Sequence, residues 1–419
     1  MRLNCSECGT AAPDGALFCV ACNGLLAFEL AAPSLDARAL REVFRLRRGS
    51  NDPLDRSGVW RYRELLPPVP REAVTTLREN DVPLFAAKAG ADYADAVRVE
   101  YLHLGMNPTA SFKDAGMTVA ISQAVASGAR IAVCASTGNT AAAMAAYAAR
   151  AGIAAVVLVP HGGVSESKLA QTLDYGATVA AVDGDFDRAL RIVRELDPQR
   201  VAIVNSVNPY RIEGQKCAAF ILLEQRDWRV PDWVVVPGGN LGNASALGKG
   251  FREAVALGLT DRLPRIGVIQ AAGAAPFARL FRDGSVLQPV KAETTASAIR
   301  IGAPASWRKA LAEVRASRGT VSSVDDAAIA DARAVIGRDG IGCEPASAAT
   351  LAGLRAFRAA GTIGRDEDVV LVLTGHVLKD GGYAAAYHAS DAAFANHIVD
   401  ARGEAPLRAL LDRVLLAHA

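Results

Sequence analysis

Residues 105–117 read GMNPTASFKDAGM, a polar turn that follows the strand-like run 97–104 and opens a helix. Lys113 stands at the boundary between turn and helix, with Phe112 before it and Asp114 after it. A partly desolvated lysine beside a helix N-terminus loses proton affinity, and its neutral amine can then form a Schiff base. From spacing alone, a surface lysine in a first helical turn is the better interpretation. The other motifs of the chain decide between the two.

Short runs rich in apolar and β-branched residues alternate with helical stretches from Val97 onward. This alternation predicts an α/β fold with parallel-rich sheets and helices on both faces. In open sheets of this kind ligands bind beyond the carboxyl ends of the strands, so the chemistry is expected in the loops that follow. After residues 97–104, the runs are Ile131–Cys134, Ala154–Val159, Thr178–Val182, Ala202–Asn205, Trp233–Val236, Ile266–Gln270 and Val369–Thr374.

Two of these loops have the composition of anion sites. ASTGNT, residues 135–140, follows a strand-like run and begins an Ala-rich helix, which places hydroxyls and backbone donors at a positive helix end. PGGNLGNA, residues 237–244, has glycines that let the backbone approach a phosphate closely. Taken alone, residues 135–140 could equally well be a helix cap. Residues 237–244 could equally be a tight bend between a strand and a helix. The glycine spacing is that of neither a Walker loop nor a dinucleotide fingerprint.

The last buried strand-like run ends in Thr374, Gly375 and His376. A neutral hydroxyl at Thr374 could face a pyridine nitrogen and leave it largely unprotonated. The alternative is a threonine that makes a local hydrogen bond at the end of a strand. His376 has the proton affinity to carry a proton near neutral pH, but a structural histidine is the better interpretation.

These segments resemble the motifs of fold-type II pyridoxal-phosphate enzymes. Residues 107–114, NPTASFKD, are similar to the cofactor-lysine signature Asn-Pro-Thr-Gly-Ser-Phe-Lys-Asp, and the other two loops resemble the family's asparagine loop and cofactor-phosphate loop. Further stretches favour the threonine synthase family over the dehydratase and cysteine-synthase branches. They are LRE 77–79 before PL 83–84, NSVNP 205–209, RIEGQK 211–216, AIRIG 298–302, PASW 304–307, EPASA 344–348 and the paired cysteines near the start.

The resemblance implies a two-lobed enzyme in which Lys113 carries pyridoxal 5'-phosphate as a Schiff base. It implies that Asn139 contacts the phenolic oxygen of the cofactor and that Thr374 faces its pyridine nitrogen. The residues implied in binding the cofactor phosphate are Gly239, Asn240, Leu241, Gly242 and Asn243. The substrate carboxylate would be bound by Ser136, Thr137 and Thr140.

The implied reaction converts O-phosphohomoserine and water to threonine and phosphate, by γ-elimination and β-addition, with Lys113 also acting as general base. Because this substrate is itself phosphorylated, a second anion site is expected. Ser206 and Arg211 would form it by resemblance, since a guanidinium fork suits phosphate oxygens, with Lys168 and Asn208 as weaker additions. The alternative for Arg211 is a surface arginine at the start of a helix. The family also leads us to expect a homodimer.

Several departures bear on the choice of substrate. Ala115 stands where the family usually has arginine, Ala110 where glycine is usual before Ser111, and Val377 where glycine is common. The loop ENDVP, residues 79–83, replaces a Glu-Gly-x-Thr-Pro pattern. One alternative is therefore an enzyme for another phosphorylated amino acid, such as a cysteate-synthase-like reaction on O-phosphoserine. Another is a catalytically silent binding protein with the same fold.

Four cysteines near the start form two closely spaced pairs. Cys5 and Cys8 are followed, after ten residues, by Cys19 and Cys22, which is the ligand count of a tetrahedral structural zinc site. The alternative is four thiols that hold no metal. Residues 1–30 contain a single basic residue, Arg2, so we expect no nucleic-acid partner.

Composition bounds the remaining possibilities. The 419 residues include 51% hydrophobic residues and 46 Lys and Arg against 44 Asp and Glu, a formal charge of +2. Such a chain can bury a substantial core and has no long-range attraction for nucleic acid or acidic membrane. With no apolar run of about 20 residues and no apolar signal core, it is expected in the cytoplasm.

We expect four parts along the chain. They are a zinc-ribbon-like module at 1–30, a segment packing on the large lobe at 31–96, a catalytic region at 97–390 with a small lobe at about 107–205, and a tail at 391–419. Within the second part, the arginine-rich stretch around Leu40 and Phe44 reads as a solvated helix and Ser57–Tyr62 as an extended approach. The tail should end in an amphipathic helix near Pro406–Leu416.

Overall fold

A computed structural model describes residues 1–161, 166–183, 188, 192, 201–284, 286–399, 401–402 and 404–417. It contains a six-stranded sheet of order β11-β10-β9-β12-β4-β3 and a four-stranded sheet of order β7-β6-β5-β8. All pairings in both sheets are parallel except that of β3 with β4. The predicted α/β fold with parallel-rich sheets is confirmed. The strands are β3 Leu84–Ala86, β4 Arg98–His103, β5 Ile131–Ala135, β6 Ala154–Pro160, β7 Thr178–Val182, β8 Val201–Ile203, β9 Trp233–Pro237, β10 Arg265–Ala271, β11 Thr320–Val324 and β12 Asp368–Leu373.

The six-stranded sheet is buried on both faces, which explains why β9 is apolar at every position and β12 at every position after Asp368. In β9, Val234 and Val236 belong to the core beneath α8, α9 and α11, whereas Val235 points into the core beneath α12 and α13. The helices are α1 Ala37–Arg48, α2 Pro53–Arg56, α3 Lys88–Ala94, α4 Lys113–Ala126, α5 Asn139–Ala151, α6 Glu166–Asp174, α8 Pro209–Gln225, α9 Gly242–Ala256, α10 Pro276–Asp283, α11 Trp307–Ala316, α12 Asp326–Arg338, α13 Pro345–Ala359, α14 Gly381–His388 and α15 Glu404–Ala417.

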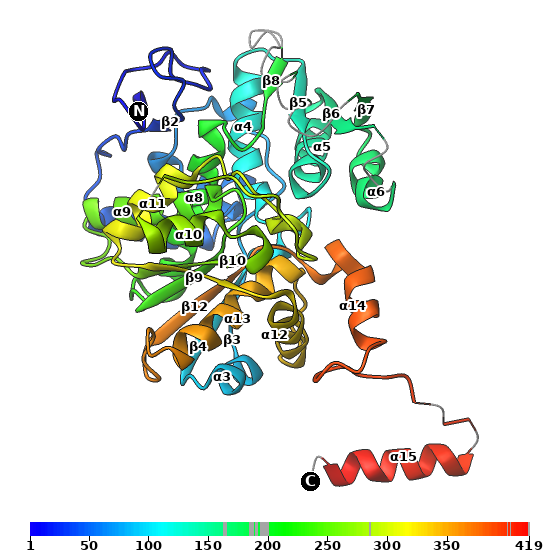
Figure 1. The fold of residues 1–419 in the computed structure, drawn as a ribbon. Helices are drawn as coiled ribbons and strands as arrows, with labels where there is room; N and C mark the ends of the chain where they lie inside the picture. Colours follow the sequence, from blue (N-terminus) through cyan, green and yellow to red (C-terminus); the bar gives the residue numbers. More distant parts are fainter. Residues whose placement is uncertain are drawn as a thin grey trace.

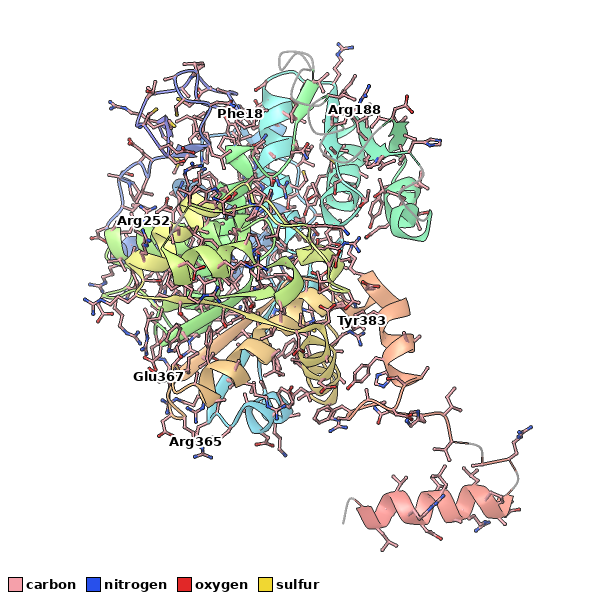
Figure 2. The ribbon with its side chains drawn as sticks, viewed as in Figure 1. Phe18, Arg188, Arg252, Arg365, Glu367 and Tyr383 are labelled. Carbon is pink, nitrogen blue, oxygen red and sulfur yellow. The ribbon has the colours of Figure 1, made fainter. Side chains whose placement is uncertain are left out.

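The four-stranded sheet lies to one side of the larger sheet, with α4 between them in the view of Figure 1. Helix α4 packs on α8 and on α5, so it connects the helices of the two sheets. Arg365 and Glu367, which lie just before β12, mark the end of the larger sheet farthest from the four-stranded sheet (Figure 2).

The first thirty residues form a small antiparallel pair, β1 Leu3–Cys5 with β2 Leu26–Phe28, that docks on α8, α9 and α11. Lys249 of α9 donates to the carbonyl of Phe28 at 2.7 Å, and Lys309 of α11 donates to the carbonyl of Leu26. Lys249 is also paired with the buried carboxylate of Glu213 in α8. Because buried charges are stable only when paired, these contacts fix the small pair of strands to the body.

Outside the sheets, the structure contradicts the prediction for one segment and agrees with the prediction for the tail. The extended conformation expected for Ser57–Tyr62 is wrong, because Trp60–Leu65 is a 3₁₀ helix that buries Trp60 and Tyr62. The tail does end in a helix, α15, which projects away from the body in Figure 1. Among the residues that the structure describes, no helix is long and apolar enough to cross a membrane.

Candidate active site

Lys113 is the first residue of α4, and the backbone before it pairs with the segment that follows β12. The Phe112 amide donates to the carbonyl of Thr374 at 2.9 Å, and the His376 amide donates to the carbonyl of Ala110 at 3.0 Å. Ala110 has a left-handed φ of 64°, which turns the chain into the helix. Two motifs far apart in the sequence therefore meet at the carboxyl end of the six-stranded sheet.

The amine of Lys113 lies 3.9 Å from the centre of the Phe112 ring, and its side chain is only partly exposed. Desolvation, with a smaller contribution from the charge of Arg211, lowers the pKa of Lys113 from 10.5 to about 7, and Glu344 opposes the change. A substantial share of the amine is therefore neutral near pH 7, as a Schiff-base lysine requires. The electrostatics favour the functional interpretation of Lys113 over that of a surface lysine.

A buried carboxylate joins two of the predicted site residues. Glu344, at the N-terminus of α13, accepts from Asn139 Nδ2 at 3.0 Å and from Thr374 Oγ1 at 3.1 Å. Thr374 Oγ1 also lies 3.1 Å from Ser347 Oγ. Burial raises the pKa of Glu344, with the bonds to Asn139 and Thr374 opposing the rise. A Cβ added at Gly375 would lie 2.3 Å from Glu344 Cδ, so this close approach requires glycine.

The glycine-rich turn ends at α9 and forms a cradle of polar groups. Leu241 has a left-handed φ of 64°, and the first amides of α9 have no acceptor within the helix. Both polar atoms of the Asn243 side chain are buried and make no hydrogen bond to any described residue. Asn240 accepts from the Ala305 amide at 2.6 Å and donates to Ser206 Oγ. The turn therefore offers donors to an anion at a positive helix end.

Arg211 is buried, with 1% of its surface exposed, so the interpretation as a surface arginine is wrong. Its Nη1 donates to the carbonyl of Val204 at 3.1 Å, while its buried Nε has no hydrogen-bond partner among the described residues. Desolvation lowers the pKa of Arg211 from 12.5 to about 10, with the Cys134 thiol opposing the change. A buried cation with no carboxylate partner among the residues that the structure describes suits an anionic ligand.

The other predicted site residues are placed differently. Ser136, Thr137 and Thr140 lie half-buried around the N-terminus of α5. Asn208 caps α8, because its Oδ1 accepts from the Tyr210 amide at 3.0 Å and its Nδ2 donates to the carbonyl of Ile203 at 2.8 Å. The Lys168 side chain lies outside the described part of the structure.

Sequence reasoning missed two charged residues that the fold brings to the predicted site. The resemblance of the EPASA stretch assigns no role to Glu344, although a lone carboxylate before the uncharged helical run 345–354 is a recognisable signal. Lys379, in the 3₁₀ helix η6 (Val377–Asp380), is close enough to Asp114 and Glu344 to interact with both. Nothing in its local sequence indicates this position.

The four cysteines near the start lie together. All four sulfur atoms are within 4.8 Å of one another, and Cys5–Cys22, Cys8–Cys22 and Cys8–Cys19 are 3.5, 3.4 and 3.6 Å apart. A tetrahedral zinc ion with Zn–S bonds of about 2.3 Å separates its sulfur ligands by roughly 3.8 Å. The cluster is therefore compatible with a structural zinc ion.

Comparison with known proteins identifies the family. A family model described as "Pyridoxal-phosphate dependent enzyme" matches residues 77–375. The chain belongs to this family. Pyridoxal phosphate is accordingly its cofactor, as the resemblance of the motifs around Lys113 implied.

Curated relatives of this pyridoxal-phosphate-dependent enzyme are threonine synthases. That of Methanosarcina acetivorans is 44% identical over 387 residues, covering 90% of this chain and 92% of the relative. That of Synechocystis is 49% identical over 322 residues, covering 76% and 82%. The crystal structure of threonine synthase from Escherichia coli matches all of both chains with a TM-score of 0.70 at 19% identity, which supports the fold. The predicted resemblance to threonine synthases is confirmed.

The residues present fit pyridoxal phosphate on structural grounds. The cofactor combines an aldehyde with a phosphate, and the chain offers a desolvated, partly neutral amine and a separate polar cradle. The unpartnered, buried side chain of Asn243 at that cradle is a group that lacks a ligand within the described protein.

Proposed function

We propose that this chain converts O-phosphohomoserine and water into threonine and phosphate. Support comes from the curated threonine synthases, which this chain matches over most of its length and most of theirs. The observation that carries the substrate assignment is the buried guanidinium of Arg211. Its Nε has no hydrogen-bond partner in the described part of the chain, and its charge lowers the pKa of Lys113. A phosphorylated substrate needs an anion site of this kind in addition to the one for the cofactor phosphate.

In this proposal Lys113 has two tasks. It holds the cofactor covalently, and once the substrate has taken its place, Lys113 Nζ removes the proton from the α carbon and then one from the β carbon. A pKa of about 7 suits both tasks, because the amine can accept and return protons near neutral pH. When bound, the cofactor supplies an electron sink for the charge that these proton transfers leave on the substrate.

The two ends of the substrate go to two groups of residues. Arg211 and Ser206 hold the phosphate, and Asn240 orients Ser206 through the hydrogen bond between their side chains. Ser136, Thr137 and Thr140 bind the carboxylate at the N-terminus of α5. Lys168 and Asn208 are weaker candidates for the phosphate, and Asn208 would first have to give up its capping bonds.

The cofactor would be held by Asn139 at its phenolic oxygen and by Gly239, Asn240, Leu241, Gly242 and Asn243 at its phosphate. Thr374 would meet the pyridine nitrogen, supported by Ser347, which accepts from the Thr374 amide at 2.8 Å. Since Asn139 donates to Glu344, movement of that carboxylate would free the amide for the cofactor.

The remaining assignments complete the proposal. Cys5, Cys8, Cys19 and Cys22 bind a structural zinc ion, the chain forms a homodimer, and it works in the cytoplasm. We divide the chain into a zinc-ribbon-like module at 1–30, a packing segment at 31–96, a catalytic region at 97–390 with its small lobe at about 107–205, and a tail at 391–419.

Phosphate release and product analysis test the proposal directly. The holoenzyme should release phosphate from O-phosphohomoserine and form an equal amount of threonine, and should be nearly inactive on O-phosphoserine. Lys113→Ala should abolish both turnover and the visible absorbance of the bound cofactor, while Lys88→Ala, on the exposed start of α3, should change neither. Turnover of O-phosphoserine alone would favour the cysteate-synthase-like alternative, and absence of turnover on both would favour a silent paralogue.

A further inference from the structure

One side chain of the four-stranded sheet's helices reaches across to the six-stranded sheet. Gln171, on α6, accepts through Oε1 from Lys379 Nζ in η6, which directly follows β12. Its Nε2 donates to the carbonyl of Thr109 at 3.4 Å and to Tyr175 Oη at 3.2 Å. A single amide thus contacts both the loop that precedes Lys113 and the segment that follows Thr374.

The contact continues to the residue beside the reactive lysine. The Thr109 amide donates to Asp114 Oδ2 at 2.7 Å, and Thr109 Oγ1 donates to Asp114 Oδ1. Asp114 is fully buried, and burial raises its pKa to about 7. Lys379 is half-buried, and its pKa is lowered by desolvation while Asp114 and Glu344 oppose the change. The ammonium group of Lys379 makes its hydrogen bond to Gln171 charge-assisted, and such a bond is stronger than one between two neutral groups.

We propose that Gln171 and Lys379 form a positioning bridge that holds α6 over the Lys113 loop during turnover and so determines whether the reaction ends in threonine. This inference rests on the proposed function and assigns to it two residues that the motifs do not include. Neither residue reacts with the substrate. They act by fixing α6 and the loop that precedes Lys113 relative to the segment that follows β12.

The chemistry gives the bridge a measurable role. The productive reaction consumes one O-phosphohomoserine and one water and yields threonine and phosphate. If the site opens after the phosphate has left but before water adds at the β carbon, the same atoms leave as 2-oxobutanoate, ammonium and phosphate, again with one water consumed. Phosphate release is common to both outcomes, so the ratio of threonine to 2-oxobutanoate reports how long the site stays closed.

The test compares product ratios in a set of variants of the holoenzyme. Lys379→Met and Gln171→Leu should each lower the ratio of threonine to 2-oxobutanoate by about tenfold, the effect of losing one charge-assisted hydrogen bond. The double variant should be no worse than either single variant, because both remove the same contact. Lys379→Arg, which keeps a donor, should recover most of the ratio. Lys88→Met, the same change on an exposed lysine of α3, should leave it unchanged.

A second measurement separates the bridge from a general loss of fold. Amide hydrogen exchange of the cofactor-free protein should speed up in α6 in both bridge variants, and should stay unchanged in α13. Wild-type enzyme that makes no threonine would overturn the proposed function itself. Wild-type enzyme that makes threonine, with both variants keeping its product ratio, would overturn the bridge while leaving the function intact. Additive losses in the double variant would also overturn it.

Discussion

Replacing the buried guanidinium of Arg211 should stabilise the protein while it damages catalysis. Desolvation lowers the pKa of Arg211 from 12.5 to about 10, which corresponds to roughly 3 kcal/mol of unfavourable free energy for keeping the charge in the folded state. Arg211→Met removes this cost, and the lost hydrogen bond to the carbonyl of Val204 offsets about half of it. The cofactor-free variant should therefore gain roughly 1–2 kcal/mol in its free energy of unfolding.

The sign of the pH dependence follows from the same shift. A cation whose pKa is lower in the folded state destabilises that state wherever the group is charged, which here means below about pH 10. The stabilising effect of Arg211→Met should thus be fully present at pH 7 and shrink as the pH rises through 10. With O-phosphohomoserine, however, the variant lacks the partner of the substrate phosphate. Loss of a buried charge partner of this kind costs about 2–5 kcal/mol, or roughly 30-fold to a few thousandfold in kcat/KM.

Two assays check the two halves of this prediction. Urea unfolding of the cofactor-free proteins gives the change in stability, and phosphate release gives the change in kcat/KM. Arg252→Met is the matched control, since Arg252 lies at the surface of α9 with 54% of its side chain exposed (Figure 2). A variant that is less stable than the wild type yet keeps its kcat/KM would show that Arg211 serves the fold and leaves the substrate to other residues.

Three further predictions concern other parts of the chain. The cofactor-free protein should attach pyridoxal phosphate at a rate that rises with pH and levels off above about 7, because only the neutral amine of Lys113 reacts and desolvation lowers its pKa to about 7; a midpoint near 10.5 in absorbance measurements would contradict this. Metal analysis should find one zinc ion per chain, and Cys19→Ser should lower both the zinc content and the thermal stability, whereas Cys217→Ser, in α8, should leave the zinc content unchanged. Asp339→Ala should lower the free energy of unfolding by about 1–2 kcal/mol without changing kcat/KM, because Asp339 accepts from the first three amides of α3; an unchanged urea midpoint would argue against this cap.

The strands were predictable where both faces of a sheet are buried. Trp233–Pro237 and the part of β12 after Asp368 are continuous apolar runs because helices cover the sheet on both sides. Thr320–Val324 was not predicted, since an edge strand with partly exposed Thr and Ser side chains has no apolar run to recognise. Leu84–Ala86 is too short for its pattern to stand out. The order of strands in each sheet also had no signal in any single segment.

The site was predictable where one motif contains its own chemistry. Lys113, Asn139 and the glycine-rich turn each lie between a strand and the start of the next helix, so local sequence indicates their position, while their roles stay predictions. Glu344 acts on Lys113, and Lys379 on Asp114 and Glu344, only through the tertiary fold, and local sequence cannot report the burial that perturbs their pKa values. The burial of Arg211 was missed for the same reason, because its neighbours in α8 are polar as well as apolar.

The contacts of Lys249 and Lys309 with the carbonyls of β2 restrict how the chain can be shortened. A version that starts after residue 30 would lack both carbonyl acceptors. Lys249 would keep its ion pair with Glu213, whereas Lys309, whose pKa desolvation already lowers to about 8, would lose the acceptor of its ammonium group. Any attempt to crystallise or engineer the catalytic part alone should therefore retain Lys249 and replace Lys309 with an apolar residue of similar length. Without this replacement, aggregation of a truncated protein would reflect the unpaired charge of Lys309 and would say little about whether the catalytic part can fold by itself.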